Sequence, residues 1–416
     1  MDIKSLLKTF TCSCGKNHSC DIKDVFIEKN AAAKIPGAVK NYNTITVVCD
    51  KNTYKVYGKE VENSLCDKNF KTVIFEDELL VPDESAIERL TSALLPCTDL
   101  IIGIGSGVIQ DLSKYVSFEK KIPYHIAATA PSMDGYASKG AAMIIGNMKI
   151  TYNAHVPEVI YADTDVLKNA PLDMIKSGFG DIVGKYSCLN DWKLSHVVNS
   201  EYICDYVYNL TFDMLLSVKD SGEKLLARDE DAVKKLMEAL VGVGVAMAYV
   251  GNSRPASGSE HHMSHFFEVT GIMNNSPYFM HGTDVLYSAY CTQKMREELL
   301  SLSAISPRPF IKADWAEKIK NIYGEAAEGV IALQEKLGWY EEDKFPLYKE
   351  KWDEIKAVLS EVPSSSELLA LIESIGLDIA EFTSLYGEEK IKNAMLYAKD
   401  LKDRYSVLWL YFALEV

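Results

Sequence analysis

The feature that most constrains the fold of this 416-residue chain is an alternation of short apolar runs with helical patterns before about residue 165. The apolar runs lie at residues 43–50, 71–76, 99–107 and 123–131, and the helical patterns at 85–96 and 108–118. Strands that alternate with helices in this way form an open, mostly parallel sheet with helices on both faces. The pattern therefore predicts an α/β domain over residues 1–165.

The periodicity and composition of the sequence change beyond residue 165. From Pro171 onwards almost every segment has helical periodicity, and Leu, Met, Ala, Glu and Lys dominate. A chain of this length also exceeds what one ordinary hydrophobic core accommodates. We therefore expect residues 166–416 to form an all-α domain.

Charge and hydropathy exclude some classes of function. The net charge of −15 argues against nucleic-acid binding, which needs many basic residues. The most apolar run, residues 239–251, is shorter than the roughly 20 residues of a membrane-spanning helix, so we expect a buried core helix and no membrane insertion. Nine scattered cysteines and the lack of a secretory signal in the opening residues favour a cytoplasmic location.

The stretch GIGSGVIQD, residues 103–111, follows a predicted strand and opens a predicted helix. Backbone N–H groups and the helix dipole can hold a diphosphate at such a point, and glycines let the backbone approach it closely. The spacing is not G-x-G-x-x-G, so a tight strand-to-helix turn without a ligand is the alternative. Asp50 ends the strand at 43–50, where it is either a ribose-binding acid or a turn residue.

A polar loop, TAPSMDGYASKGA, follows the predicted strand at 123–131. Open α/β sheets bind ligands beyond the carboxyl ends of their strands. Thr129, Ser132 and Ser138 are therefore candidate cofactor contacts, and Asp134 is a candidate for binding a substrate hydroxyl. The alternative is an ordinary capped loop, because the same residue types favour turns and caps.

Three of the eight histidines occur together in SGSEHHMSHFFEV, as His261, His262 and His265. On a helix, His261 and His265 share a face, and His262 and His265 nearly do, so spacing does not choose between the first two. No Glu lies between them as in H-E-x-x-H, which leaves a metalloprotease unsupported. With Asp181 and His281 they would form an N/O site suited to Zn, Fe(II) or Ni, although the local sequence by itself favours Asp181 as a capping or first-turn residue.

A second group of metal-binding residue types occurs near the N-terminus, in TCSCGKNHSC. Cys12, Cys14, His18 and Cys20 could nominally supply four soft ligands. Their C-x-C spacing is tighter than is usual for structural zinc. A polar N-terminal hairpin or loop is therefore favoured over a bound metal.

The order of these motifs is more specific than each motif alone. A glycine turn, TAPSxDGxAS, GxGDxxGKxxxxxDWxxS, EHxxSHxxE and a following HG resemble the sn-glycerol-1-phosphate dehydrogenase family, in the dehydroquinate synthase and iron-containing alcohol dehydrogenase superfamily. The resemblance runs from about Cys12 to His281 and is most specific around Ser132 and Asp181. It implies a dehydroquinate synthase-like fold, with a Rossmann-like α/β domain and an all-α domain. The implied reaction is the reversible, metal-dependent reduction of dihydroxyacetone phosphate by NAD(P)H.

The resemblance also implies a role for each matching residue. The NAD(H) or NADP(H) diphosphate would be held by Gly105, Ser106, Gly107, Val108 and Ile109, with Asp50 near the adenosine ribose. Further cofactor contacts would come from Thr129, Ala130, Pro131, Ser132 and Ser138. One divalent metal, Zn, Ni or Fe, would be bound by Asp181, His261 and His281. Substrate would be contacted by Asp134, Asp181 and His265, of which Asp181 and His265 would be catalytic.

The family pattern E-H-x-x-S-H selects His261 over His262. Two departures from the family are visible: GSG stands where many relatives have GGG, and GTDV after His281 replaces the HGE of many synthases. A glycerol or other polyol dehydrogenase, a dehydroquinate synthase-like cyclase and a non-enzymatic nucleotide-binding protein are the alternatives.

Further expectations concern the substrate, the cofactor and the assembly. The substrate would be a small phosphorylated molecule, with Lys139 and Lys185 as candidate phosphate contacts. The Asp50 carboxylate favours NAD over NADP, since it would repel a 2′-phosphate. A homodimer is the expected assembly.

Overall fold

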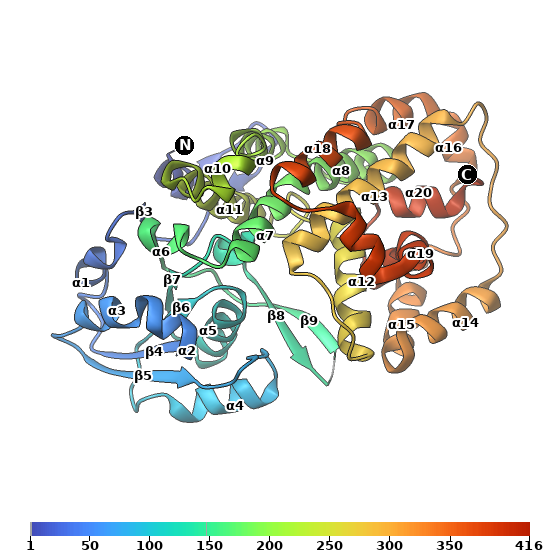
Figure 1. Ribbon diagram of the computed structural model, residues 1–416. Helices are drawn as coiled ribbons and strands as arrows, with labels where there is room; N and C mark the ends of the chain where they lie inside the picture. Colours follow the sequence, from blue (N-terminus) through green and yellow to red (C-terminus); the bar gives the residue numbers. More distant parts are fainter. Residues whose placement is uncertain (1, 147) are drawn as a thin grey trace. The chain divides into compact units, whose positions relative to one another are not determined.

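A computed structural model describes residues 2–146 and 148–416 of the chain (Figure 1). The chain forms two compact units. The first runs as far as Phe179 and also includes Glu223–Gly251, and the second comprises Gly180–Gly222 and Asn252–Val416. This division differs from a single boundary near residue 165, because α11 (Glu230–Val250) packs against η4 (Asp134–Ala137) and α6 (Thr164–Lys168) of the first unit.

The first unit is built on a six-stranded sheet with the order β3-β10-β7-β6-β4-β5. All its strand pairs are parallel. The strands are β3 (Asp24–Glu28), β4 (Thr44–Asp50), β5 (Asn69–Phe75), β6 (Leu100–Gly105), β7 (Tyr124–Ala128) and β10 (Val159–Asp163). The predicted α/β fold with a parallel sheet is therefore confirmed, and β6 lies between β4 and β7.

Alternate residues of these strands face two different helix layers. On one face Ile45, Ile102 and Ile104 belong to a hydrophobic core. This core also includes Val39, at the end of α1 (Ile35–Ala38), and Val61 of α3 (Lys59–Asn63). Helix α5 (Gly107–Lys120) packs against β4, β6 and β7. A Cβ at Gly103 would lie only 2.7 Å from Ser113 Oγ of α5, so the glycine permits this close packing.

Shorter elements complete the first unit. Its other helices are α1 (Ile35–Ala38), α2 (Lys51–Thr53), α3 (Lys59–Asn63), α4 (Glu84–Ala93), α5 (Gly107–Lys120) and the first part of α7 (Leu172–Val183). There are two antiparallel hairpins among the described residues. The first, β1 (Phe10–Thr11) with β2 (Asn17–His18), lies in the segment where the sequence favoured a hairpin or loop, and the second, β8 (Gly140–Ile145) with β9 (Met148–Asn153), was not predicted. The apolar run at 239–251 lies within or just beyond α11, whose residues are largely buried, as expected for a core helix.

The second unit is helical, which confirms the expected character of the C-terminal region. Its helices are α8 (Lys185–Asn199), α9 (Asp205–Val218), α12 (Ser259–Met273), α13 (His281–Ser301), α14 (Lys312–Tyr323), α15 (Ala327–Leu337), α16 (Phe345–Glu350), α17 (Trp352–Leu359), α18 (Ser365–Ser374), α19 (Ile379–Tyr397) and α20 (Val407–Ala413); the short α10 (Gly222–Leu226) lies where the chain returns to the first unit.

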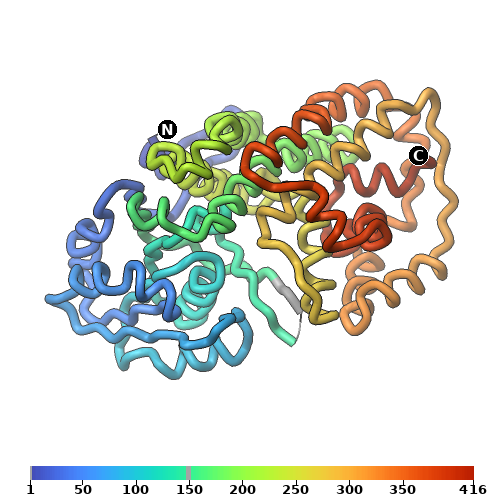
Figure 2. The backbone as a smooth tube through the Cα atoms, viewed as in Figure 1, coloured from blue at the N-terminus to red at the C-terminus, as the bar shows by residue number. Residues whose placement is uncertain are grey.

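An extended segment between α13 and α14 (orange in Figure 2) returns to the C-terminal end of the chain. Pro307 pairs with Leu414, and Arg308 N–H donates to the Ala413 carbonyl at 2.8 Å. Leu299, Ile355, Trp409 and Leu410 lie in the hydrophobic core of this region. The segment and the last helix thus stabilise each other.

Among the described residues, the structure contains no helix that is both long and apolar enough to cross a membrane.

Candidate functional site

The glycine turn lies at the carboxyl end of β6, as its sequence predicted. β6 ends at Gly105, Ser106 precedes the helix, and α5 begins at Gly107. An added Cβ at Gly105 would lie 2.6 Å from Ile109 Cβ, whereas one at Gly107 would meet nothing within 4 Å. The Thr129 N–H donates to the Gly105 carbonyl at 3.1 Å, so the structure brings the glycine turn and the 129–138 loop together.

A pocket of about 150 Å³ opens beside this turn. It is lined by Asp50, Asn52, Asp77, Glu78, Leu79, Leu80, Ser106, Val108 and Ile109. Asp50 reaches it because β4 and β6 are neighbours in the sheet. Its Oδ1 also accepts hydrogen bonds from the Asn52 and Thr53 N–H groups at 2.8 and 2.9 Å, so Asp50 is both a helix cap and a pocket residue.

The loop after β7 is buried and tied down from several sides. Thr129, Ala130, Pro131 and Ser132 are all buried. The Tyr136 hydroxyl donates to the Ala130 carbonyl at 2.7 Å. A Cβ at Gly178 in α7 would lie 1.8 Å from the Pro131 carbonyl oxygen, so only glycine lets α7 approach the loop this closely.

Lys114 is a contributor to this loop that the sequence reasoning missed. Its ammonium group is fully buried and donates to the carbonyls of Gly135 (3.2 Å) and Gly140 (2.6 Å) and to Ser138 Oγ (3.4 Å). Burial lowers the pKa of Lys114, and the nearby Asp111 carboxylate partly offsets that effect. Ser138 therefore takes part in closing the loop, and Asp134 begins η4 with 9% exposure. A lysine on the sheet-facing side of α5 was the available sequence signal.

The second unit brings together Asp181, His261 and His281. Asp181 lies in the last turn of α7, His261 in the first turn of α12, and His281 begins α13. One ligand atom from each lies within 4.8 Å of the others, and His261 Nε2 lies 3.4 Å from Asp181 Oδ1. The His265 ring lies beside them, with its centroid 5.5 Å from that of His281 and 6.1 Å from that of His261.

Lys185 forms a buried ion pair with Asp181. Its Nζ lies 2.8 Å from Asp181 Oδ1 and donates to the Ala256 carbonyl at 2.9 Å. Burial by itself raises the pKa of Asp181, but the charge of Lys185 and the hydrogen bond with His261 outweigh it, so this pKa lies well below its ordinary value. The sequence made Lys185 a candidate phosphate contact. In the structure its ammonium group instead positions Asp181.

Glu260 is the second residue whose role the sequence did not reveal. Its Oε1 lies 2.6 Å from His261 Nδ1 and accepts a hydrogen bond from the Gly258 N–H at 2.8 Å. A carboxylate on Nδ1 fixes the orientation of the ring and directs Nε2 towards Asp181. Burial lowers the pKa of His261, but its contacts with Asp181 and Glu260 outweigh this and raise it. An acid directly before the histidine was the available sequence signal.

His262 lies outside the cluster. It is fully buried, and neither of its ring nitrogens has a hydrogen-bond partner among the described residues. Burial, with contributions from Arg404, Lys402 and Arg254, holds its pKa well below the ordinary value, so the ring is neutral. The geometry thus separates His261 from His262, which spacing alone did not.

The three gathered side chains fit a divalent metal. One carboxylate and two imidazoles form a mixed N/O donor set, which zinc, nickel and ferrous iron accept. The hydrogen bond that His261 Nδ1–H donates to the Glu260 carboxylate is of the kind that metal-binding histidines commonly make. Ser264 Oγ lies 3.4 Å from His281 Nδ1 and orients the third ligand in a comparable way.

The chain is similar in sequence to known dehydrogenases. Residues 27–171 match the family of iron-containing alcohol dehydrogenases. Glycerol-1-phosphate dehydrogenase [NAD(P)+] of Halalkalibacterium halodurans is 29% identical over 96% of this chain and 94% of that protein. The protein of the same name from Geobacillus thermodenitrificans is 30% identical over 91% of this chain and 89% of that protein.

Solved structures support the fold. An alcohol dehydrogenase from an archaeon of a Red Sea brine pool has a TM-score of 0.62, covering 95% of this chain and 97% of that one. The two sequences are only 14% identical, so this similarity concerns the fold alone.

Proposed function

Because the chain belongs to the glycerol-1-phosphate dehydrogenase family, we propose that it catalyses the reversible, metal-dependent reduction of dihydroxyacetone phosphate to sn-glycerol-1-phosphate by NAD(P)H. The observation that carries the proposal is the gathering of Asp181, His261 and His281 around one point. A parallel sheet with a glycine turn at its carboxyl edge supports it within the same chain.

The glycine turn and the 129–138 loop are the proposed cofactor site. The N–H groups at the start of α5, from Ser106 to Ile109, suit a diphosphate. The pocket beside them would take the adenosine ribose. Asp50, Asp77 and Glu78 all line that pocket, and three carboxylates would repel a 2′-phosphate, so we propose a preference for NAD over NADP.

Asp181, His261 and His281 are the proposed metal ligands. A divalent metal bound there supplies a fixed positive charge next to the ketone oxygen of the substrate. Glu260 holds the His261 ring so that Nε2 faces the site. Lys185 keeps Asp181 ionised and in place.

A nicotinamide cofactor held at the glycine turn would supply the hydride for the substrate carbonyl carbon. His265, beside His281, is proposed to hydrogen-bond a substrate oxygen and to relay a proton, and Asp134 to bind a substrate hydroxyl. The net charge of −15 makes positive potential for the substrate phosphate a local requirement. With Lys185 engaged by Asp181, Lys139, whose side chain is 45% exposed, is the candidate for that contact.

We also propose that the enzyme is a cytoplasmic homodimer. The thiol form of all nine cysteines supports a reducing compartment. Size-exclusion chromatography with light scattering measures the mass, and a monomeric mass would refute the dimer.

A side-by-side assay of NADH oxidation tests the substrate. Dihydroxyacetone phosphate and dihydroxyacetone are compared in the presence of added Zn²⁺, Ni²⁺ or Fe²⁺. We expect the phosphorylated ketone to be reduced with the higher kcat/KM. Faster reduction of dihydroxyacetone would indicate a polyol dehydrogenase, and no turnover with any metal would overturn the proposal.

Alanine variants test the site. Asp181→Ala and His261→Ala should lose metal and turnover while NAD(H) still binds, because the proposed cofactor residues belong to the first unit. His262→Ala is the matched control and should show only a modest loss. A dead His262→Ala enzyme with an active His261→Ala enzyme would reverse the assignment.

A further inference from the structure

The N-terminal hairpin lies outside the proposed catalytic machinery and raises a question of stability. Its strands β1 and β2 contain only two residues each, paired as Phe10 with His18 and Thr11 with Asn17. Gly15, with φ +84°, turns the chain between them. Hairpins this short are at best marginal in water, so something further must hold the turn in shape.

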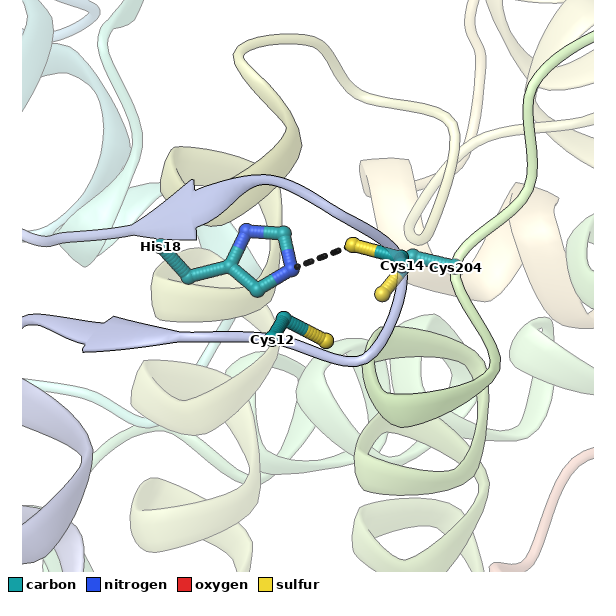
Figure 3. A group of neighbouring side chains, drawn as sticks. All are labelled: Cys12, Cys14, His18 and Cys204. Atoms are coloured by element: carbon teal, nitrogen blue, oxygen red, sulfur yellow. Dashed lines mark hydrogen bonds between the residues drawn. The ribbon is translucent and has the colours of Figure 1, made fainter.

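Three side chains of the hairpin point their metal-binding atoms at one another. Cys12 Sγ, Cys14 Sγ and a ring nitrogen of His18 all lie within 4.8 Å of one another (Figure 3). Cys14 Sγ is 3.5 Å from His18 Nε2. Cys12 and His18 are buried, with 7% and 0% exposure, within the N-terminal hairpin that the sequence favoured. Figure 3 also labels Cys204, a residue of the second unit.

The other nitrogen of His18 is held by α11. His18 Nδ1 lies 2.9 Å from the Tyr249 carbonyl oxygen. A carbonyl oxygen only accepts, so Nδ1 carries the proton and the Nε2 lone pair faces the cysteine sulfurs. The ring is stacked on Tyr249 at 5.3 Å and meets Phe10 edge-on at 5.5 Å. Metal-binding histidines are oriented by outer contacts of this kind.

We propose that Cys12, Cys14 and His18 bind a structural Zn²⁺ ion. Two thiolates and one imidazole are soft ligands that zinc prefers, unlike the N/O set around Asp181. Both cysteines are thiols in the structure, so each loses a proton when the metal binds. Structural zinc takes four ligands, and the hairpin supplies three of them.

The fold explains how so tight a spacing can form a site. Cys12 N–H donates to the Lys16 carbonyl at 2.9 Å and Gly15 N–H to the Cys12 carbonyl at 3.0 Å, so the C-x-C segment curls into a compact turn. The register of β1 and β2 then returns His18 to the side of Cys12 and Cys14. The ion would fasten the turn to α11 through His18 and Tyr249.

Metal content of the full-length protein is the first test. After dialysis against zinc and removal of loosely bound metal, Cys14→Ser and His18→Ala should each hold one equivalent of zinc per chain less than wild type. Cys20→Ser is the matched control, because Cys20 is a buried thiol of the same segment outside the group, with a pKa raised by burial to about 11. Unchanged zinc content in both ligand variants would overturn the proposal.

A measurement on the folded wild-type protein guards against variants that fail to fold. Cobalt(II) replaces zinc and absorbs in the near ultraviolet when thiolates bind it. We expect this sulfur-to-cobalt band in wild type, in Cys20→Ser and also in Asp181→Ala, and its loss in Cys14→Ser. No such band in wild type would refute the zinc site. Because Asp181→Ala should keep the band, the test is independent of the proposed catalytic metal.

Discussion

Glu260 shows how one residue can decide the chemistry of its neighbour. Its carboxylate holds His261 Nδ1 at 2.6 Å and so leaves Nε2 facing Asp181. Lys185 acts in a similar way on Asp181, but with the opposite charge: its buried ammonium group lies 2.8 Å from Asp181 Oδ1. Replacing either residue should therefore weaken metal binding even though neither needs to contact the substrate.

Replacing Glu260 with Gln should therefore weaken metal binding by about 10- to 100-fold, the range typical of lost outer-shell partners. Gln keeps an acceptor for Nδ1 but removes the charge that makes the ring a stronger ligand. A competition assay with a chromogenic chelator measures the affinity. Glu268→Gln, on the same helix but outside the cluster, is the control, and equal affinities in the two variants would contradict this role.

His262 makes a prediction about pH. Its folded-state pKa is well below the ordinary value, while in the unfolded chain it is about 6.5. The unfolded state therefore binds more protons below that pH, and the stability of the folded protein falls as pH decreases from about 6.5. His262→Leu removes this one group and should flatten the fall by up to about 1.4 kcal/mol per pH unit.

Urea unfolding of wild type and His262→Leu at pH 7.5 and pH 5 measures the difference. At the higher pH the two free energies of unfolding should respond to small pH changes alike. An equal loss of stability on acidification in both proteins would show that His262 is already protonated in the fold.

At the scale of elements, close approach of backbones positions both parts of the site. Gly178 lets α7 meet the Pro131 carbonyl, and Gly180 on the same helix lets it meet the Gly282 carbonyl of α13, where a Cβ would lie 2.2 Å away. The motif GFGDIVG is therefore a packing motif as well as the source of Asp181. Its glycines were visible in the sequence, but the surfaces they meet were not.

Gly178→Ala should destabilise the protein by about 1–3 kcal/mol, because the Pro131 loop must move to admit the methyl group. NAD(H) binding should weaken with it, since the same loop carries Thr129 and Ser132. Gly329→Ala is the matched control: it also lies within a helix, α15, but its Cβ would meet nothing within 4 Å, so it should stabilise by about 0.5–1 kcal/mol. Thermal unfolding and NADH titration measure both, and similar effects of the two substitutions would refute the packing argument.

The sequence predicted the helices and strands better than the tertiary contacts that they make. The strands at 43–50, 99–107 and 123–131 and the helix at 108–118 are present because alternation and glycine punctuation are local signals. The placement of α11 against η4, the burial of Lys114 and the pairing of Lys185 with Asp181 depend on contacts between distant segments. The contact that orients His18 could not be read from the sequence for the same reason, because the Tyr249 carbonyl lies 231 residues away along the chain.

For the whole molecule, the proposed metal and cofactor residues lie in different compact units. Removal of metal by a strong chelator should therefore stop turnover while NADH still binds with nearly unchanged affinity. Isothermal titration with NADH before and after chelation measures this, and added Zn²⁺, Ni²⁺ or Fe²⁺ should restore the rate. Loss of NADH binding together with the metal would show that the two sites are not separable.

The first unit is assembled from two stretches of chain, since Glu223–Gly251 joins it after the chain has passed through Gly180–Gly222. On the ribosome, α11 emerges only after helices that belong elsewhere. The strands of the parallel sheet are therefore synthesised early, but η4 has no covering helix until α11, which ends at Val250, has been made. Completion of this unit during synthesis is thereby delayed, and a chain that stalls before α11 would present that uncovered apolar surface to chaperones and proteases.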